Sequence, residues 1–125
     1  MANGALLIVD DDPQMRMLLS ARVRQHGFTC VFAADCYQAI SMARQHQPRA
    51  ILLDLHMPAG DGFLVLQRLK SLPALSTIPV VVISSDDRTR AEAPALEAGA
   101  VAYLEKPIQN DSLEAALTVA LGNLN

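Results

Sequence analysis

The fold of this chain is decided by one stretch near its start, ALLIVDDDP at residues 5–13, in which a strand of the buried type runs directly into three acids. A second stretch, AILLD at residues 50–54, repeats the pattern of apolar residues followed by a carboxylate. Two such strands lying side by side would gather several negative charges at one edge of a sheet. That arrangement is costly unless a hard cation lies among the charges, so the two stretches predict a metal site.

Apolar runs of strand length recur along the whole chain. They lie at Leu6–Val9, Thr29–Phe32, Ala50–Leu53, Val80–Ile83 and Val101–Leu104. Because the runs are rich in Val and Ile and do not alternate with polar residues, they are typical of strands covered on both faces. Segments with a helical period lie between them. Five strand–helix units in series predict a parallel sheet with helices on both faces.

Right-handed crossovers leave few topologies for such a sheet. We predict a single α/β domain over residues 1–125, a flavodoxin-like (βα)5 three-layer sandwich whose five-stranded parallel sheet has the order 2-1-3-4-5. Ligands of these sheets bind at the carboxyl ends of the strands, near the switch between strands one and three. Asp10, Asp11 and Asp54 are expected at that place.

Helix caps can also be predicted from local signals. Asp12 before Pro13 is typical of an N-cap, which makes Asp12 a cap rather than a metal ligand, and Asp35 is expected to cap the second helix. Either Asn110 or Asp111 is expected to cap the last one.

Glycine and proline mark two less regular places. After Asp54, Gly60 and Gly62 are expected to take backbone conformations that other residues avoid, with Asp61 as a cap. Pro94 lies inside the segment of the fourth helix, so that helix either starts at Pro94 or is kinked there.

Composition excludes several classes of function. The formal net charge is −3, only 18% of the residues are charged and no basic run is present, so this domain alone is not expected to bind nucleic acid. Cys30 and Cys36 lack zinc spacing with the three histidines, which favours free thiols in a reducing cytosol. No signal peptide is recognisable and no stretch approaches the roughly 20 apolar residues that span a bilayer. We therefore expect a cytoplasmic protein without membrane contact.

Further polar groups follow the last two strands. Ser84 and Ser85 end the fourth, and Lys106 follows the fifth. Each is unspecific alone, since hydroxyls form turns and lysines are usually solvated. A hydroxyl and an ammonium group at the same rim as three carboxylates could together hold a phosphoryl group bound to one of the acids.

With these residues in this order, the chain resembles the response-regulator receiver domains of two-component signalling, the CheY-like family. The likeness covers essentially all 125 residues. It rests on Val9-Asp10-Asp11, Asp54 with Met57-Pro58 and Asp61-Gly62, Ser84-Ser85, Tyr103 and Lys106-Pro107.

The resemblance implies a phosphoacceptor and a Mg²⁺ site. Asp54 would accept the phosphoryl group. Asp11 would bind Mg²⁺ directly and Asp10 mainly through water, with Asp54 and the main-chain carbonyl of His56 as further ligands.

It also implies roles at the other strand ends. Ser84, where the family more often has Thr, and Lys106 would contact phosphoryl oxygens, and the peptide before Pro107 is expected to be cis. Tyr103 matches an aromatic switch position and would turn inward as Ser84 moves. The simpler alternative for Tyr103 is a half-buried ring whose hydroxyl lies in water.

Two variable positions of the family are occupied by His56 and Asp86. Their side chains are expected to tune the rate of dephosphorylation. The His56 side chain is expected to face solvent rather than to bind the metal, because Mg²⁺ prefers oxygen ligands.

Partners follow from the same resemblance. A sensor histidine kinase or a histidine phosphotransfer protein would donate the phosphoryl group, and a downstream target or output domain would read the face formed by the fourth helix, fifth strand and fifth helix. The domain would be a monomer or a phosphorylation-dependent dimer, either on its own or as part of a longer regulator or hybrid kinase. It would promote only its own phosphotransfer and dephosphorylation. Two other classes remain: a receiver-shaped docking module that never needs phosphate, and a small Mg²⁺-dependent phosphohydrolase.

Overall fold

The computed structural model describes residues 4–57 and 62–122, and strands alternate with helices throughout. Gly60 and Asp61, for which a turn and a cap were predicted, lie outside the described residues. In chain order the elements are β1 (Ala5–Val9), α1 (Pro13–Arg24), β2 (Thr29–Ala33), α2 (Cys36–His46), β3 (Ala50–Asp54), α3 (Gly62–Ser71), β4 (Val80–Ser84), α4 (Arg88–Glu97), β5 (Ala102–Glu105) and α5 (Asn110–Leu121).

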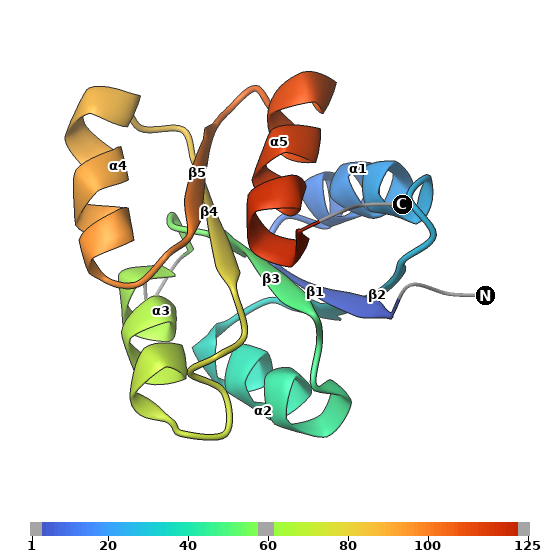
Figure 1. The fold of residues 1–125 in the computed structure, drawn as a ribbon, viewed down its shortest axis with the longest axis vertical. Coiled ribbons are helices and arrows are strands. Elements are labelled where there is room, and N and C mark those ends of the chain that lie inside the picture. Colours follow the sequence, from blue (N-terminus) through green and yellow to red (C-terminus); the bar gives the residue numbers. More distant parts are fainter. Residues whose placement is uncertain (1–3, 58–61, 123–125) are drawn as a thin grey trace.

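The five strands form one parallel sheet in the order β2-β1-β3-β4-β5 (Figure 1). The predicted flavodoxin-like topology is therefore confirmed. Each predicted strand is present, with ends within one residue of those expected. Asp54 and Ser84 are the last residues of β3 and β4, so both belong to the sheet itself.

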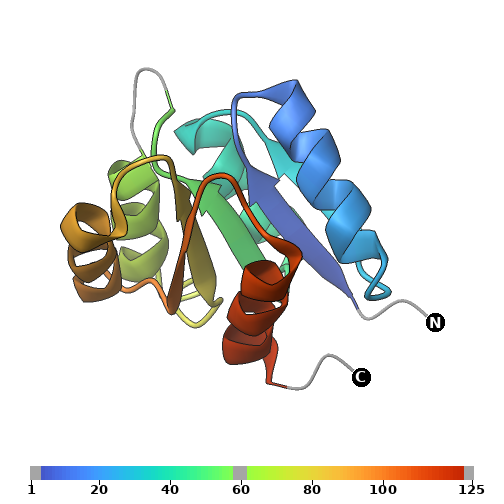
Figure 2. The same ribbon diagram turned by 90° about the horizontal axis from the view of Figure 1, so that it is seen from above.

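Helices cover both faces of the sheet (Figure 2). Residues of α2, α3 and α4 join one apolar cluster and residues of α1 and α5 join the other. Side chains alternate along β1 as the pleat requires, so Leu7 and Val9 belong to the first cluster and Leu6 and Ile8 to the second. This two-sided burial explains why the strand is apolar without interruption.

β2 departs from the expected burial. Thr29 and Phe32 are exposed, whereas the run was predicted to be covered on both faces. The prediction is wrong for this strand because β2 lies at an edge of the sheet and pairs with β1 alone.

The first two helices start as predicted. Asp12 accepts a hydrogen bond from the Gln14 amide at 2.9 Å, and Asp35 accepts one from the Gln38 amide at 2.8 Å. Pro13 is the first residue of α1, a position at which its missing N–H leaves no helical bond unmade.

Of the two alternatives predicted for α4, a start at Pro94 is wrong. The helix begins at Arg88 rather than at Pro94, because Asp87 caps its first turn by accepting a hydrogen bond from the Thr89 amide at 3.1 Å. It continues through Pro94, which has no N–H to bond with the preceding turn.

The cap predicted for α5 is wrong. The helix begins at Asn110, Gln109 takes the N-cap position and no side chain caps the amides there. Asp111 instead lies in the first turn, where its charge favours the helix dipole. None of the helices in the described part of the chain has both the length and the hydropathy needed to cross a bilayer.

Candidate functional site at the carboxyl edge of the sheet

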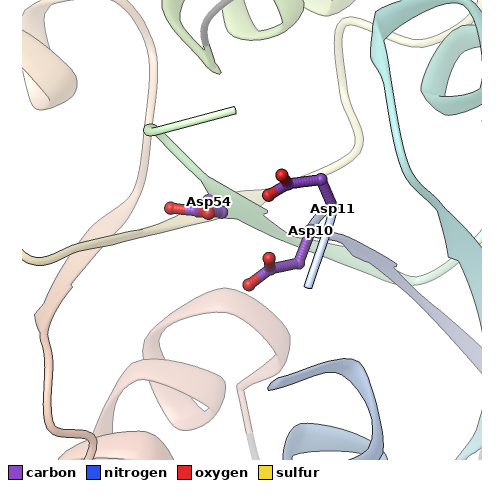
Figure 3. A group of neighbouring side chains, drawn as sticks. All are labelled: Asp10, Asp11 and Asp54. Carbon is purple, nitrogen blue, oxygen red and sulfur yellow. The ribbon is translucent and has the colours of Figure 1, made fainter. Parts of the chain in front are cut away.

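Three carboxylates gather where β1 and β3 end. One carboxylate oxygen from each of Asp10, Asp11 and Asp54 can be chosen so that the three atoms lie within 4.8 Å of one another. Figure 3 shows Asp10 and Asp11 beside the end of β3, with their carboxylates directed toward Asp54. The strands pair in register, with Val9 opposite Leu53, so the acid that follows each residue stands at the same level of the sheet. The acids at the ends of the stretches 5–13 and 50–54 are therefore brought together, as predicted.

The three acids differ in burial. Asp10 is 1% exposed and Asp54 3%, whereas Asp11 is exposed. Asp10 Oδ1 accepts a hydrogen bond from the Asp12 amide at 2.9 Å, but its Oδ2 is buried and has no hydrogen-bond partner among the described residues. A buried carboxylate oxygen without a hydrogen-bond partner costs free energy, so Asp10 Oδ2 indicates a site where a ligand could bind.

Burial also changes the acidity of Asp10. Desolvation raises its pKa from 3.8 to about 6, and the negative charges of Asp54 and Asp11 act in the same direction. The amide of Asp12 and the ammonium group of Lys106 lower the pKa and offset part of this shift. In the protein without a bound cation, ionisation of Asp10 is therefore less favourable than ionisation of an exposed aspartate.

Lys106 brings one positive charge to the acids. Its Nζ lies 3.6 Å from Asp54 Oδ1 and 3.9 Å from Asp10 Oδ2, which is ion-pair distance but too long for a good hydrogen bond. The Lys106–Pro107 peptide is cis, as the resemblance implied. The Lys106 amide donates to the Ser84 carbonyl at 2.8 Å and so holds the end of β5 beside β4.

Ser84 ends β4 and is completely buried. Its Oγ accepts a hydrogen bond from the Asp86 amide at 2.9 Å, which leaves the hydroxyl hydrogen for a separate acceptor. Because β4 pairs with β3, with Ile83 opposite Asp54, Ser84 lies one step beyond the phosphoacceptor candidate along the neighbouring strand.

His56 contributes both main-chain and side-chain contacts. Its amide donates to Asp54 Oδ1 at 3.0 Å and orients that carboxylate. Its imidazole Nε2 lies 2.9 Å from Asp86 Oδ2, and both side chains are about half exposed. The imidazole thus faces solvent as predicted, but the pairing with Asp86 joins the loops that follow β3 and β4, and the sequence did not predict it.

Gly62 is required by space. A Cβ atom there would lie 2.5 Å from both the Asp54 carbonyl oxygen and the Leu55 Cα. The Gly62 amide also donates to the Leu55 carbonyl at 2.8 Å. The structure gives this glycine a steric reason that was not predicted: the first turn of α3 packs directly on the chain that carries Asp54.

Tyr103 is buried, with 4% of its surface exposed. Its hydroxyl donates to the Asp86 carbonyl at 2.9 Å, so the alternative of a half-buried ring with its hydroxyl in water is wrong. The guanidinium carbon of Arg88 lies 5.6 Å from the centre of the ring. Sequence reasoning missed Arg88, because no local pattern relates residues fifteen positions apart.

The donor set fits Mg²⁺. Three carboxylates lie within reach of one ion, one buried oxygen has no hydrogen-bond partner among the described residues, and the nearby Lys106 ammonium group is beyond hydrogen-bond distance. Mg²⁺ takes a few carboxylate ligands and keeps several waters, and the exposure of Asp11 leaves the site open to water.

Comparison with known proteins gives concordant matches. The family model for the response regulator receiver domain matches residues 6–118. Protein PilH of Pseudomonas aeruginosa is 30% identical over 116 residues, which are 93% of this chain and 96% of PilH. The DNA-binding dual master transcriptional regulator RpaA of Synechocystis is 33% identical over 93% of this chain, but that match spans only 48% of RpaA.

A solved structure with a metal ion matches as well. The receiver domain of the sensor histidine kinase PA1611 from Pseudomonas aeruginosa, with magnesium coordinated in its active site cleft, has a TM-score of 0.86 at 25% identity. The match covers 98% of this chain and 100% of that one. Since the family match runs from the second residue of β1 to the last turns of α5, the chain belongs to the response regulator receiver domains of two-component signalling and has their CheY-like fold.

Proposed function

We propose that residues 1–125 act as one receiver domain, which accepts a phosphoryl group on Asp54 in a Mg²⁺-dependent reaction. The observation that carries the proposal is the buried Oδ2 of Asp10, which has no hydrogen-bond partner among the described residues and lies 3.9 Å from the Lys106 ammonium group. Burying this oxygen without a hydrogen bond costs free energy that the distant ammonium group offsets only in part, and a cation bound at the site during function would offset the rest.

Four groups would hold the ion: the carboxylates of Asp10, Asp11 and Asp54 and the carbonyl of His56. When bound, Mg²⁺ supplies the positive charge that offsets the repulsion between a carboxylate and the phosphoryl oxygens. The amide of His56 fixes Asp54 through its 3.0 Å hydrogen bond, which leaves the second carboxylate oxygen for reaction.

The transfer forms one bond and breaks another. An Asp54 oxygen bonds to phosphorus while the bond between phosphorus and a histidine nitrogen of the donor breaks, and that nitrogen keeps the electron pair. A proton on the other ring nitrogen makes the imidazole a neutral leaving group. Lys106 and the hydroxyl of Ser84 stabilise the phosphoryl oxygens, so catalysis is positioning and electrostatics. The donor is a sensor histidine kinase or a histidine phosphotransfer protein in the cytoplasm.

The phosphorylated site signals through Ser84 and Tyr103. Phosphoryl oxygens compete for the Ser84 hydroxyl, the loop after β4 follows Ser84, and the Asp86 carbonyl that holds the Tyr103 hydroxyl moves with that loop. This biases a two-state equilibrium of the face formed by α4, β5 and α5, which a target or output domain reads. The domain acts as a monomer or a phosphorylation-dependent dimer, and it hydrolyses its own aspartyl phosphate.

Radiolabelled phosphotransfer tests the assignment of Asp54. Incubation with acetyl phosphate or a phosphorylated histidine kinase, in the presence of Mg²⁺, should label the protein in an acid-labile, hydroxylamine-sensitive form. Asp54→Asn should abolish the label. Asp12→Asn is the matched control, because Asn is an equally good N-cap and the residue caps α1 outside the site. Full labelling of Asp54→Asn would rule out the assignment.

The alternative of a phosphate-independent docking module predicts a different response to beryllofluoride, a mimic of the phosphoryl group. A phosphoacceptor should show a saturable, Mg²⁺-dependent change in the NMR signals of Ser84 and Lys106, and the change should disappear on adding a chelator. A docking module should show no change under either condition.

A further inference from the structure

Tyr103 is held in its buried position by the segment between β4 and α4. Its hydroxyl donates to the Asp86 carbonyl, two residues before α4 begins. Its ring is covered by the side chain of Arg88, the first residue of α4. Both contacts come from one short segment, so the orientation of Tyr103 and the position of the start of α4 depend on each other.

Arg88 contacts Tyr103 in two ways. Its guanidinium carbon lies 5.6 Å from the ring centre, within the range of a cation–π interaction. Its Nη2 also donates to the Tyr103 carbonyl at 3.4 Å. A planar guanidinium group can stack on a ring and donate at its edge at the same time, which a lysine ammonium cannot do.

Glu92 keeps Arg88 in this place. Its carboxylate accepts a hydrogen bond from Arg88 Nη1 at 3.0 Å, four residues further along α4. A free arginine side chain samples many rotamers, and this ion pair restricts Arg88 to those that lie over the ring. Among the described residues the Glu92 carboxylate bonds to Arg88 and makes no hydrogen bond to Tyr103, so the inference has Glu92 act on the ring through Arg88.

Arg88 lies between the phosphorylation site and the signalling face. It lines a hollow of about 290 Å³ together with Lys106 and Pro107. It also lines a groove of about 350 Å³ on the face of α4, β5 and α5, which includes Leu96, Val119 and Tyr103 itself. The Arg88 side chain therefore borders both the hollow beside Lys106, at the carboxyl edge of the sheet, and the surface groove beside Tyr103.

We propose that Arg88, kept in place by Glu92, is a positioning residue that stabilises the buried orientation of Tyr103 and couples the rim beside Lys106 to the α4–β5–α5 face. The inference rests on the proposed function in one respect, that Tyr103 is the switch of this face. The cation–π contact at this partly exposed position should favour the buried orientation by about two- to five-fold.

The test uses the two tyrosines of the chain. The chain has no tryptophan, and its other tyrosine, Tyr37, is 83% exposed. Tyr37→Phe therefore leaves Tyr103 as the sole source of tyrosine fluorescence. Acrylamide quenching then reports the accessible fraction of Tyr103. The variants are Arg88→Met, which keeps a long unbranched side chain without the guanidinium group, and Glu92→Gln. Arg90→Met is the control, because Arg90 is an exposed arginine of the same helix whose side chain makes no hydrogen bond, ion pair or cation–π contact with the described residues.

Arg88→Met should raise the accessible fraction about two- to five-fold, Glu92→Gln should raise it less, and Arg90→Met should leave it unchanged. The double variant Arg88→Met with Glu92→Gln should match Arg88→Met alone, since Glu92 acts through Arg88. Equal quenching of Arg88→Met and Arg90→Met would overturn the proposal. An added effect of Glu92→Gln in the Arg88→Met background would show that Glu92 does not act through Arg88. Circular dichroism of each variant checks that the fold is kept.

The same measurement in an Asp54→Asn background separates this inference from the proposed function. Quenching needs no phosphoryl group, so the effect of Arg88→Met should persist there. If Asp54 were not the phosphoacceptor, the quenching result would stand. If phosphotransfer to Asp54 occurred but Arg88→Met left Tyr103 unchanged, the coupling through Arg88 would fail by itself.

Discussion

The middles of β1, β3 and β4 and the carboxyl ends of the same strands are both buried, but their side chains differ in chemistry. Ile8, Leu52 and Val82 in the middles are fully buried and apolar. At the ends, Asp54 and Ser84 are almost as buried, and so is Asp10 just beyond β1. Burying an aliphatic side chain stabilises the fold by about 1.5–3 kcal/mol, whereas burying a carboxylate costs free energy unless it is paired.

The difference shows how stability and function are divided in this domain. The strand middles supply the stability that allows the carboxyl edge to hold costly groups close together. Substitutions in the middles should therefore change the free energy of unfolding and leave ligand affinity alone. Substitutions at the edge should change both, or should even stabilise the protein when no metal is bound.

Leu52→Ala in the middle of β3 should produce the largest loss of stability. Leu52 is fully buried on the face of the sheet that α1 and α5 cover, so its truncation should lower the free energy of unfolding by about 2–5 kcal/mol, measured by urea denaturation. Mg²⁺ affinity, measured by calorimetry, should not change. Phe32→Ala on the edge strand is the control and should cost less, because Phe32 is already 37% exposed. A parallel loss of Mg²⁺ affinity in Leu52→Ala would contradict the division.

Asp10 should make the metal-free protein less stable as the pH rises. Because burial raises its pKa from 3.8 to about 6, the folded protein holds more protons than the unfolded chain between those values. The free energy of unfolding should therefore fall between pH 4 and pH 6, by about 3 kcal/mol from this group, and stay constant above.

Urea denaturation in a chelator, across this pH range, checks the effect of Asp10. The free energy of unfolding of Asp10→Asn should not fall in this way. From pH 4 to pH 6 the variant should therefore become more stable relative to the wild type, and added Mg²⁺ should reduce that difference. Asp11→Asn is the matched control at an exposed acid of the same cluster. Stability curves for Asp10→Asn and the wild type that stay parallel would show that Asp10 titrates normally.

Gly62→Ala should affect both stability and the site. The added Cβ would lie 2.5 Å from the backbone of Asp54 and Leu55, and backbone cannot move aside as a flexible side chain can. We expect a loss of about 1–3 kcal/mol together with weaker Mg²⁺ binding. Gly99→Ala is the control: its Cβ would meet Lys70 at 2.8 Å, away from the acids, so it should cost stability but keep Mg²⁺ affinity. Unchanged Mg²⁺ affinity in Gly62→Ala would show that the backbone displacement at Asp54 and Leu55 does not disturb the metal site.

The contact between the side chains of His56 and Asp86 should have the smallest effect on stability, about 0–1 kcal/mol, because both side chains are half exposed. Its removal should instead shorten the lifetime of the phosphoryl group on Asp54, because the pair joins the two loops beside the site and restricts the approach of water. Decay of radiolabel from His56→Ala, Asp86→Ala and the double variant measures this. The double variant should decay no faster than the faster single variant, and additive effects would show that the residues act separately.

Much of the edge could be predicted from the chain alone. Strand ends lay within one residue of the prediction because a continuous apolar run has few other ways to be buried. The meeting of Asp10, Asp11 and Asp54 followed from the strand order. The start of α4 did not follow, since the cap at Asp87 outweighed the signal of Pro94.

Contacts between distant segments were beyond sequence reasoning. The stacking of Arg88 on Tyr103 and the pairing of His56 with Asp86 depend on how the loops after β3 and β4 and the strand β5 pack together. The reason for Gly62 was also missed, because close approach of another segment leaves no trace in the local sequence.

The amino-acid sequence by itself determined the alternation of strands and helices, the sheet order and the edge at which the acids collect, because these depend on hydrophobic period and chain connectivity. Only the tertiary structure decided that Asp10 is buried, with one oxygen that has no hydrogen-bond partner among the described residues, while its neighbour Asp11 is exposed. Successive side chains at a strand end point in opposite directions, and what covers each one is set by segments far away along the chain.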